Sequence, residues 1–282
     1  MEKAILKTLY YSDIFDYPLK GYEVYKWLIG YETSLLKVEK ILNSLVKKRK
    51  IQKSRDFYFL KNKNKLISKR QRRLKCSHRF LIKAKILTQT LKLIPWIKLV
   101  GISGGLALDN ADKKDDIDLF LITSKKRLWI SRLLSILILD FLGVRRKVNM
   151  KNVSGKICVN TILDEDHLQQ EIDLYTAHEV LQMKVLWQRE GIYSKYLKDN
   201  EWIFKYLPNW SSPIKYLKPK KGKVSQFFNI LEEISKLIQL KIMKKPEGLE
   251  RIEEGGLYFY PNDSKEQILS LYRKKVKHLI SP

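Results

Sequence analysis

The sequence predicts a protein that mixes helices and strands, with a central mixed sheet between a small N-terminal unit and a C-terminal helical region. Three observations predict this. Apolar residues recur at helical spacing through the first 50 residues, residues 97–102 and 116–123 are short apolar runs typical of buried strands, and helical patterns dominate after residue 166. We therefore expect an α+β or α/β chain divided into residues 1–60, 61–95, 96–165 and 166–282.

The charge of the chain suggests a polyanionic partner. The 282 residues include 56 Lys or Arg and 30 Asp or Glu, a formal net charge of +26. Such an excess favours nucleic acid first and an anionic membrane surface second. The alternative is that lysine only decorates the surface.

Nothing in the sequence predicts a membrane span or an oxidising compartment. The most apolar segment, Leu128–Leu142, is interrupted by Arg132 and Asp140 and is shorter than the roughly 20 residues that a span needs. The N-terminus lacks the apolar core of a signal peptide. Cys76 and Cys158 form neither a disulfide framework nor a metal-ligand spacing, so we expect a reducing, cytoplasmic setting.

Residues 1–60 predict three helices followed by a hairpin. The helices are expected over 4–15, 21–29 and 35–49, with Ser34 as the N-cap of the third, and residues 51–60 alternate like two short strands. This order resembles a winged helix-turn-helix. The resemblance implies that the third helix reads a duplex, or else that the unit only contacts another protein. The phosphate contacts would come from Lys37, Lys40, Lys47, Lys48 and Arg49.

A basic helix is expected to link this unit to the rest of the chain. Residues 57–108 contain 13 Lys or Arg and no Asp or Glu. Apolar residues from Phe80 to Ile94 nevertheless recur at helical spacing, which indicates a helix with one packed and one basic face.

The middle of the chain predicts a strand over 97–102, a glycine turn, a short helix and a strand over 116–123. A helix over 124–142 should follow, with Ser124 as its N-cap and Gly143 as its stop. Further elements are expected as strands over 144–150, 156–163 and 257–260 and helices over 175–188, 223–244 and 264–278, with a break at Pro208 and Pro213.

The residues with the clearest chemistry are a glycine turn and two aspartates. Gly104 and Gly105 precede Asp116 and Asp118, which open the second strand. Side chains at i and i+2 of a strand share a face, so the two carboxylates can bind hard divalent cations such as Mg²⁺. Backbone N–H groups of the glycine turn can bind phosphate. The pattern predicts metal-assisted chemistry on a nucleoside triphosphate.

This stretch resembles the nucleotidyltransferase superfamily of the DNA polymerase beta type, and in particular its minimal members. The pattern falls on Gly104, Ala107, Ala111, Asp116, Ile117, Asp118 and Leu119. The resemblance implies that Asp116 and Asp118 are catalytic and hold one or two Mg²⁺ ions. It also implies transfer of a nucleotidyl group from an NTP to a hydroxyl, with release of pyrophosphate. Candidate nucleotide-binding residues are Ser103, Gly104, Gly105 and Lys114.

Two positions depart from the family pattern. Gly105 stands where the family has a serine, so Ser103 is the nearest hydroxyl. The third carboxylate is also missing: Asn160 occupies the expected face of the later strand, and an amide cannot act as a base at neutral pH. Asp164 and Glu165 lie just beyond it and are the alternatives.

These departures leave three functions open. The first is a Mg²⁺-dependent nucleotidyltransferase whose acceptor is a nucleic acid end, a protein or a small molecule. The second is a nucleic-acid-binding regulator whose transferase domain senses nucleotide or is inactive. The third is a basic scaffold whose winged unit docks a partner protein. His178 and Gln182 share a helix face, for which helix packing is favoured over a metal site.

Overall fold

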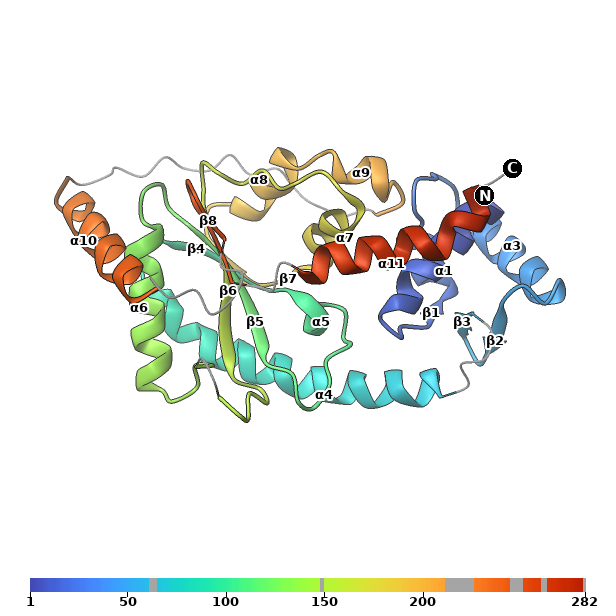
Figure 1. Cartoon of the computed structure of the whole chain (residues 1–282), viewed down its shortest axis with the longest axis horizontal. Helices are drawn as coiled ribbons and strands as arrows, with labels where there is room; N and C mark the ends of the chain where they lie inside the picture. Colours follow the sequence, from blue (N-terminus) through green and yellow to red (C-terminus); the bar gives the residue numbers. More distant parts are fainter. Residues whose placement is uncertain (61–64, 148–149, 211–225, 244–250, 260–262, 281–282) are drawn as a thin grey trace.

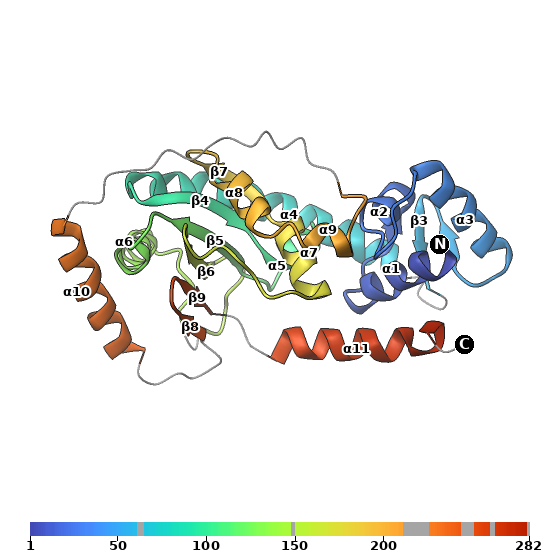
Figure 2. The ribbon, with the colours of Figure 1, turned by 90° about the horizontal axis from the view of Figure 1, so that it is seen from above.

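The structure is a computed structural model, and it describes residues 1–60, 65–147, 150–210, 226–243, 251–259 and 263–280. The described chain is mixed α and β, with eleven α-helices, a three-stranded sheet and a six-stranded mixed sheet. Figures 1 and 2 show an N-terminal unit and a larger unit joined along one side by the long helix α4 (Leu66–Leu87). Among the described helices, none is long and apolar enough to cross a membrane.

The N-terminal unit contains the three predicted helices and the predicted hairpin. Its helices are α1 (Glu2–Ile14), α2 (Gly21–Lys26) and α3 (Leu35–Lys47), and its strands are β1 (Leu19–Lys20), β2 (Gln52–Ser54) and β3 (Phe57–Phe59). The strand β1 was not predicted and adds to β3, giving the order β1-β3-β2. Ser34 is the N-cap of α3, but its side chain makes no capping hydrogen bond. Apolar residues from all three helices bury one core against the sheet.

Helix α4 uses part of its basic run to hold the N-terminal unit. Arg70 bonds to Glu23 at 2.5 Å and stacks over the ring of Tyr17, and Lys69 pairs with Asp16 at 2.6 Å. The 3-10 helix η1 (Thr88–Leu93) follows α4 and leads into the central sheet. The basic residues that stay exposed on α4 include Arg72, Lys75 and Arg79.

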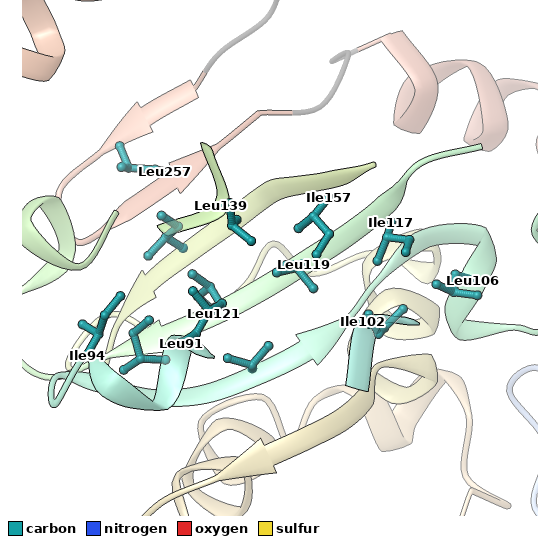
Figure 3. Packing of buried hydrophobic residues seen from close by; sticks show 14 of the residues in the cluster. Leu91, Ile94, Ile102, Leu106, Ile117, Leu119, Leu121, Leu139, Ile157 and Leu257 are labelled. Carbon is teal, nitrogen blue, oxygen red and sulfur yellow. The ribbon is translucent and has the colours of Figure 1, made fainter. Parts of the chain in front are cut away.

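The central sheet has the order β7-β4-β5-β6-β9-β8. Strands β4 (Ile97–Ile102) and β5 (Ile117–Thr123) are antiparallel, and β5 is parallel to β6 (Ile157–Asp164). Between them lie α5 (Gly104–Ala107) and α6 (Leu128–Phe141). Side chains alternate across β5: Leu119 and Leu121 pack toward η1 and α6, as Figure 3 shows for the apolar cluster, whereas Phe120 and Ile122 face a second core.

Two predictions around α6 are wrong. The helix begins at Leu128 with Arg127 at its N-cap, not at Ser124. The reason is that residues 124–127 form a turn, whose Lys126 N–H is accepted by Asp164 at 2.6 Å. Gly143 ends the helix as expected, with φ of 64°. The predicted strand over 144–150 does not form a ladder among the described residues. Only a single bridge, between Arg145 and Ile157, is present there.

The C-terminal region adds helices on the second face of the sheet and three strands to its edges. Helix α7 (Leu174–Gln182) ends earlier than predicted, and β7 (Lys184–Gln188) pairs with β4 instead of continuing the helix. The run Val185-Leu186-Trp187 suits a strand, and the free edge of β4 decides its conformation. The remaining elements are α8 (Ile192–Asp199), α9 (Ile203–Tyr206), α10 (Gln226–Ile242), β8 (Arg251–Glu253), β9 (Gly256–Tyr258) and α11 (Asp263–Ile280).

These later elements contain one further difference from the sequence prediction. The predicted strand near residue 257 forms a hairpin with β8, which was not predicted. The chain break expected at Pro208 follows α9, whereas Pro213 lies outside the described residues.

Candidate active site

The two predicted aspartates lie together at the start of β5. Asp116 immediately precedes the strand and Asp118 is its second residue, so both side chains leave the same face. Oxygen atoms of the two carboxylates and the Sγ of Cys158 all lie within 4.8 Å of one another. Cys158 belongs to this group because β6 is parallel to β5 and its register places Cys158 opposite Asp118.

The glycine turn closes directly over Asp118. The Ser103 N–H donates to the carbonyl of Asp118 at 3.1 Å, which fixes the end of β4 to the start of β5. Gly104 has φ of +63°, and a Cβ on it would lie 3.0 Å from Oδ2 of Asp118. Both the backbone angle and this close approach favour glycine. Gly105 is different: a Cβ there would meet the Asn110 carbonyl at 3.7 Å, an ordinary contact.

A cavity of about 300 Å³ opens in front of these residues. Its walls are the aspartate end of β5, the middle of β6, helix α7, the β8–β9 hairpin and the start of α11. Of the residues predicted for the site, the cavity is lined by Ser103, Gly104, Asp116, Asp118 and Asn160. Gly105 and Lys114 are not among the lining residues, and Lys114 is exposed in the loop before β5.

Three neighbours of the aspartates were not predicted from sequence. Arg146 donates from Nη1 to Oδ2 of Asp116 at 2.8 Å. Glu179, on α7, accepts the Gly104 N–H, and burial raises the pKa of its carboxyl to about 7. Cys158 is the third: burial and the two carboxylates raise the pKa of its thiol to about 12.

The carboxyl of Asp118 is held in a setting that disfavours its charge. Burial is the main cause and the neighbouring Asp116 carboxylate the second, and together they raise the pKa of Asp118 far above its usual range. Arg146 opposes this shift only in part. An added cation would relieve it, since Arg146 neutralises the two carboxylates only in part.

The third position beside the aspartates is Cys158 rather than Asn160. Across the β5–β6 ladder, Leu119 pairs with Val159 and Phe120 pairs with Thr161, so Asn160 is the extra residue of a bulge. Asn160 still lines the cavity, next to Thr161. Asp164 and Glu165 lie at the far end of the strand, where Asp164 is opposite Thr123 and Glu165 pairs with Lys98 at 2.7 Å.

The far wall of the cavity is basic but internally paired. Lys265 binds Asp173 at 2.6 Å and also pairs with Glu171, and Arg251 pairs with Glu171 and with Glu253. Thus the acidic cluster and a partly neutralised basic wall face one cavity.

Arg127, Arg132 and His178 have structural roles. Arg127 donates to Asn229 at 2.8 Å and Arg132 donates to Gln239, so both join α6 to α10. His178 is buried between Tyr11 and Trp27, with ring centroids 4.1 and 5.3 Å away. It therefore packs α7 against the N-terminal unit, as favoured from the sequence.

Replacing His178 with Phe should remove part of the acid sensitivity of the fold. Burial lowers the pKa of His178 to about 3, so below about pH 6.5 the unfolded chain binds a proton that the folded chain refuses. This group therefore costs stability as the pH falls from 6.5 toward 3. We expect the free energy of unfolding of wild type, relative to His178→Phe, to decline across that interval in urea titrations. A constant difference from pH 7 to pH 4 would contradict this.

The comparisons with known proteins add no relative. The chain matched no protein-family model, and a search of curated proteins gave no significant match.

Proposed function

We propose that the cavity binds a nucleoside triphosphate with Mg²⁺ and transfers its nucleotidyl group to a hydroxyl. The observation that carries this proposal is the closure of Gly104 over Asp118, with Asp116 on the same face. A glycine turn beside a carboxylate pair gives polyphosphate and cation adjacent places to bind. The succession of strand, turn, strand, helix and strand around it also agrees with the resemblance to the nucleotidyltransferases.

Two carboxylates at the cavity offer the oxygen ligands that a hard cation prefers. Asp116 and Asp118 would hold it, and when bound it would neutralise charge on the phosphates and activate the α-phosphorus for attack. The Gly104 backbone allows phosphate to approach without a side chain in the way. Arg146, at the mouth of the site and 46% exposed, can exchange Asp116 for a phosphate oxygen. The Oγ of Ser103 is buried without a partner in the described chain and can donate to the same ligand.

Glu179 would position the turn. Its carboxyl accepts from the Gly104 N–H, and this holds the glycine against Asp118. Because the pKa of this carboxyl is about 7, its proton is exchangeable near neutral pH.

The test is release of pyrophosphate from each of the four labelled NTPs with Mg²⁺. It should be run with single-stranded and duplex nucleic acid, with protein and with small hydroxyl compounds as acceptors. The proposal expects label to appear on one acceptor class. It fails if no acceptor is labelled and no pyrophosphate is released.

A second function, duplex binding, is favoured by the exposed cations on α3. All five predicted contact residues are exposed, although Lys48 also pairs with Glu2 at 2.7 Å. Together with Arg72, Lys75 and Arg79 of α4, they form basic surfaces on both parts of the molecule. We infer a nucleic-acid partner that either accepts the nucleotidyl group or is simply bound; a protein partner of the N-terminal unit is the alternative.

The combined replacement of Lys37 and Lys40 by Gln should weaken duplex binding and reduce its salt dependence. Each lost phosphate contact lowers the slope of log K against log salt by about 0.9. Anisotropy of a labelled duplex at several salt concentrations measures this slope. Replacement of Lys236 and Lys241, on α10, is the matched control for lost charge. Equal slopes for both variants would argue against α3 as the contact surface.

A further inference from the structure

Cys158 has a position that the proposed function leaves unused. Its Sγ and one oxygen each of Asp116 and Asp118 lie within 4.8 Å of one another. In the described part of the chain, this is the one group of three acidic, cysteine or histidine side chains with such proximity. The three residues are carried by paired strands, β5 and β6, so the backbone holds them in register.

The spacing of these atoms is close to that of ligands around one ion. Zinc lies about 2.0–2.2 Å from carboxylate oxygen and about 2.3 Å from cysteine sulfur, so the ligand atoms of a tetrahedral site are roughly 3.5 Å apart. Rotations of the side chains would have to bring the three atoms to that spacing. Sulfur also changes the preference of the site, because thiolate favours softer cations such as Zn²⁺ and Co²⁺, whereas Mg²⁺ takes oxygen.

An independent observation indicates that a polar ligand belongs here. Ser103 is 9% exposed, lines the same cavity, and its Oγ has no hydrogen-bond partner among the described residues. Buried hydroxyls are nearly always satisfied by protein, water or ligand. Ser103, Gly104 and Asp118 all line this cavity, so a ligand bound there lies within the same set of walls as the hydroxyl.

A positive charge already lies beside the three ligands. Arg146 donates to Asp116 at 2.8 Å and hydrogen-bonds with Cys158. The guanidinium thus occupies the position from which a bound cation would neutralise Asp116 and Cys158. It is 46% exposed and can leave for solvent or for a phosphate.

We propose that Asp116, Asp118 and Cys158 bind a thiophilic divalent cation, of zinc or cobalt character, in place of an oxygen-only magnesium set. On binding, the Cys158 thiol releases its proton to solvent and the sulfur donates an electron pair to the cation. This proposal rests on the proposed function in using the same two aspartates, and it changes the cation that they hold from Mg²⁺ to a softer one.

Titration of the full chain with Co²⁺, without nucleotide, tests this. Wild type should develop the near-ultraviolet absorption of thiolate-to-cobalt charge transfer, saturating at one equivalent. The variant Cys158→Ser should lose that band. Cys76→Ser should keep it, because Cys76 is the other cysteine and lies buried on α4. Binding of Co²⁺ by wild type without the band, a band that survives in Cys158→Ser, or no uptake of Co²⁺ would each overturn the proposal.

The result of the Co²⁺ titration can be distinguished from the result of the nucleotidyl-transfer assay. Pyrophosphate release with Mg²⁺ and no cobalt–thiolate band would refute the cysteine ligand alone. A band that depends on Cys158, with no nucleotidyl transfer in Mg²⁺, Mn²⁺, Co²⁺ or Zn²⁺, would refute the transferase alone.

Discussion

Replacing Asp118 with Asn should reduce nucleotidyl transfer by at least about 10³-fold and at the same time stabilise the ligand-free protein. Activity falls because the amide cannot supply the negative charge that a cation needs. Stability rises because the half-buried carboxyl, beside Asp116, has a pKa far above that of an unfolded chain. The folded protein binds this proton more tightly, so stability from this group is present at low pH and declines as the pH rises through its folded pKa.

Two measurements check this prediction. Urea titrations at pH 8 should show Asp118→Asn to be more stable than wild type by about 1–2 kcal/mol, with the gap narrowing toward pH 4. The matched control is Asp115→Asn, since Asp115 is exposed and its side chain accepts the nearby Asp112 N–H, which an amide oxygen also accepts. The activity and the stability of Asp115→Asn should equal those of wild type within experimental error. An Asp118→Asn variant that keeps activity, or that is less stable than wild type at pH 8, would contradict the account.

The second large effect is expected at Gly104. In Gly104→Ala, the positive φ costs about 1–2 kcal/mol, and the new methyl lies 3.0 Å from the Asp118 carboxylate. Either the Asp118 carboxylate or the turn must therefore shift by a few tenths of an ångström. A displacement of this kind should reduce kcat/KM by about 100-fold.

The neighbouring glycine provides the control for Gly104→Ala. Gly105→Ser places its Cβ at an ordinary contact distance from the Asn110 carbonyl and needs no positive φ. It also restores the hydroxyl found in the nucleotidyltransferases that the motif resembles. We expect unchanged stability and equal or higher activity. If Gly104→Ala and Gly105→Ser behave alike in steady-state kinetics, the closure of Gly104 over Asp118 has no functional importance.

Short-range sequence patterns predicted the elements whose conformation depends on residues nearby in the chain. The strand Ile97–Ile102 and the strand that follows Asp116 were predicted closely, because their apolar runs are short and bounded by turn residues. The stretch Lys184–Gln188 was not, since its helical and strand patterns are similar and only the distant edge of β4 selects the strand. The same holds for β8, whose partner β9 must first be placed against β6.

The candidate site shows the same division. Asp116 and Asp118 could be placed on one face from their spacing alone, and Gly104 from the motif. Cys158 could not, because the choice between it and Asn160 depends on a bulge in β6 that no spacing reveals. Glu179 comes from a helix 61 residues after Asp118, so only the tertiary structure brings it to the glycine turn. The one signal in the sequence that could have indicated Glu179 was an ionisable residue on the face of α7 that meets the sheet.

Binding of Mn²⁺ measured by electron paramagnetic resonance, with and without a non-hydrolysable NTP, shows whether Asp116 and Asp118 hold a cation beside the nucleotide. We expect wild type and Asp115→Asn to bind one or two ions more tightly when the nucleotide is present, and the double variant Asp116→Asn with Asp118→Asn to bind none at the same concentration. Equal Mn²⁺ binding by wild type and the double variant, with or without nucleotide, would show that this acidic pair does not hold the cation.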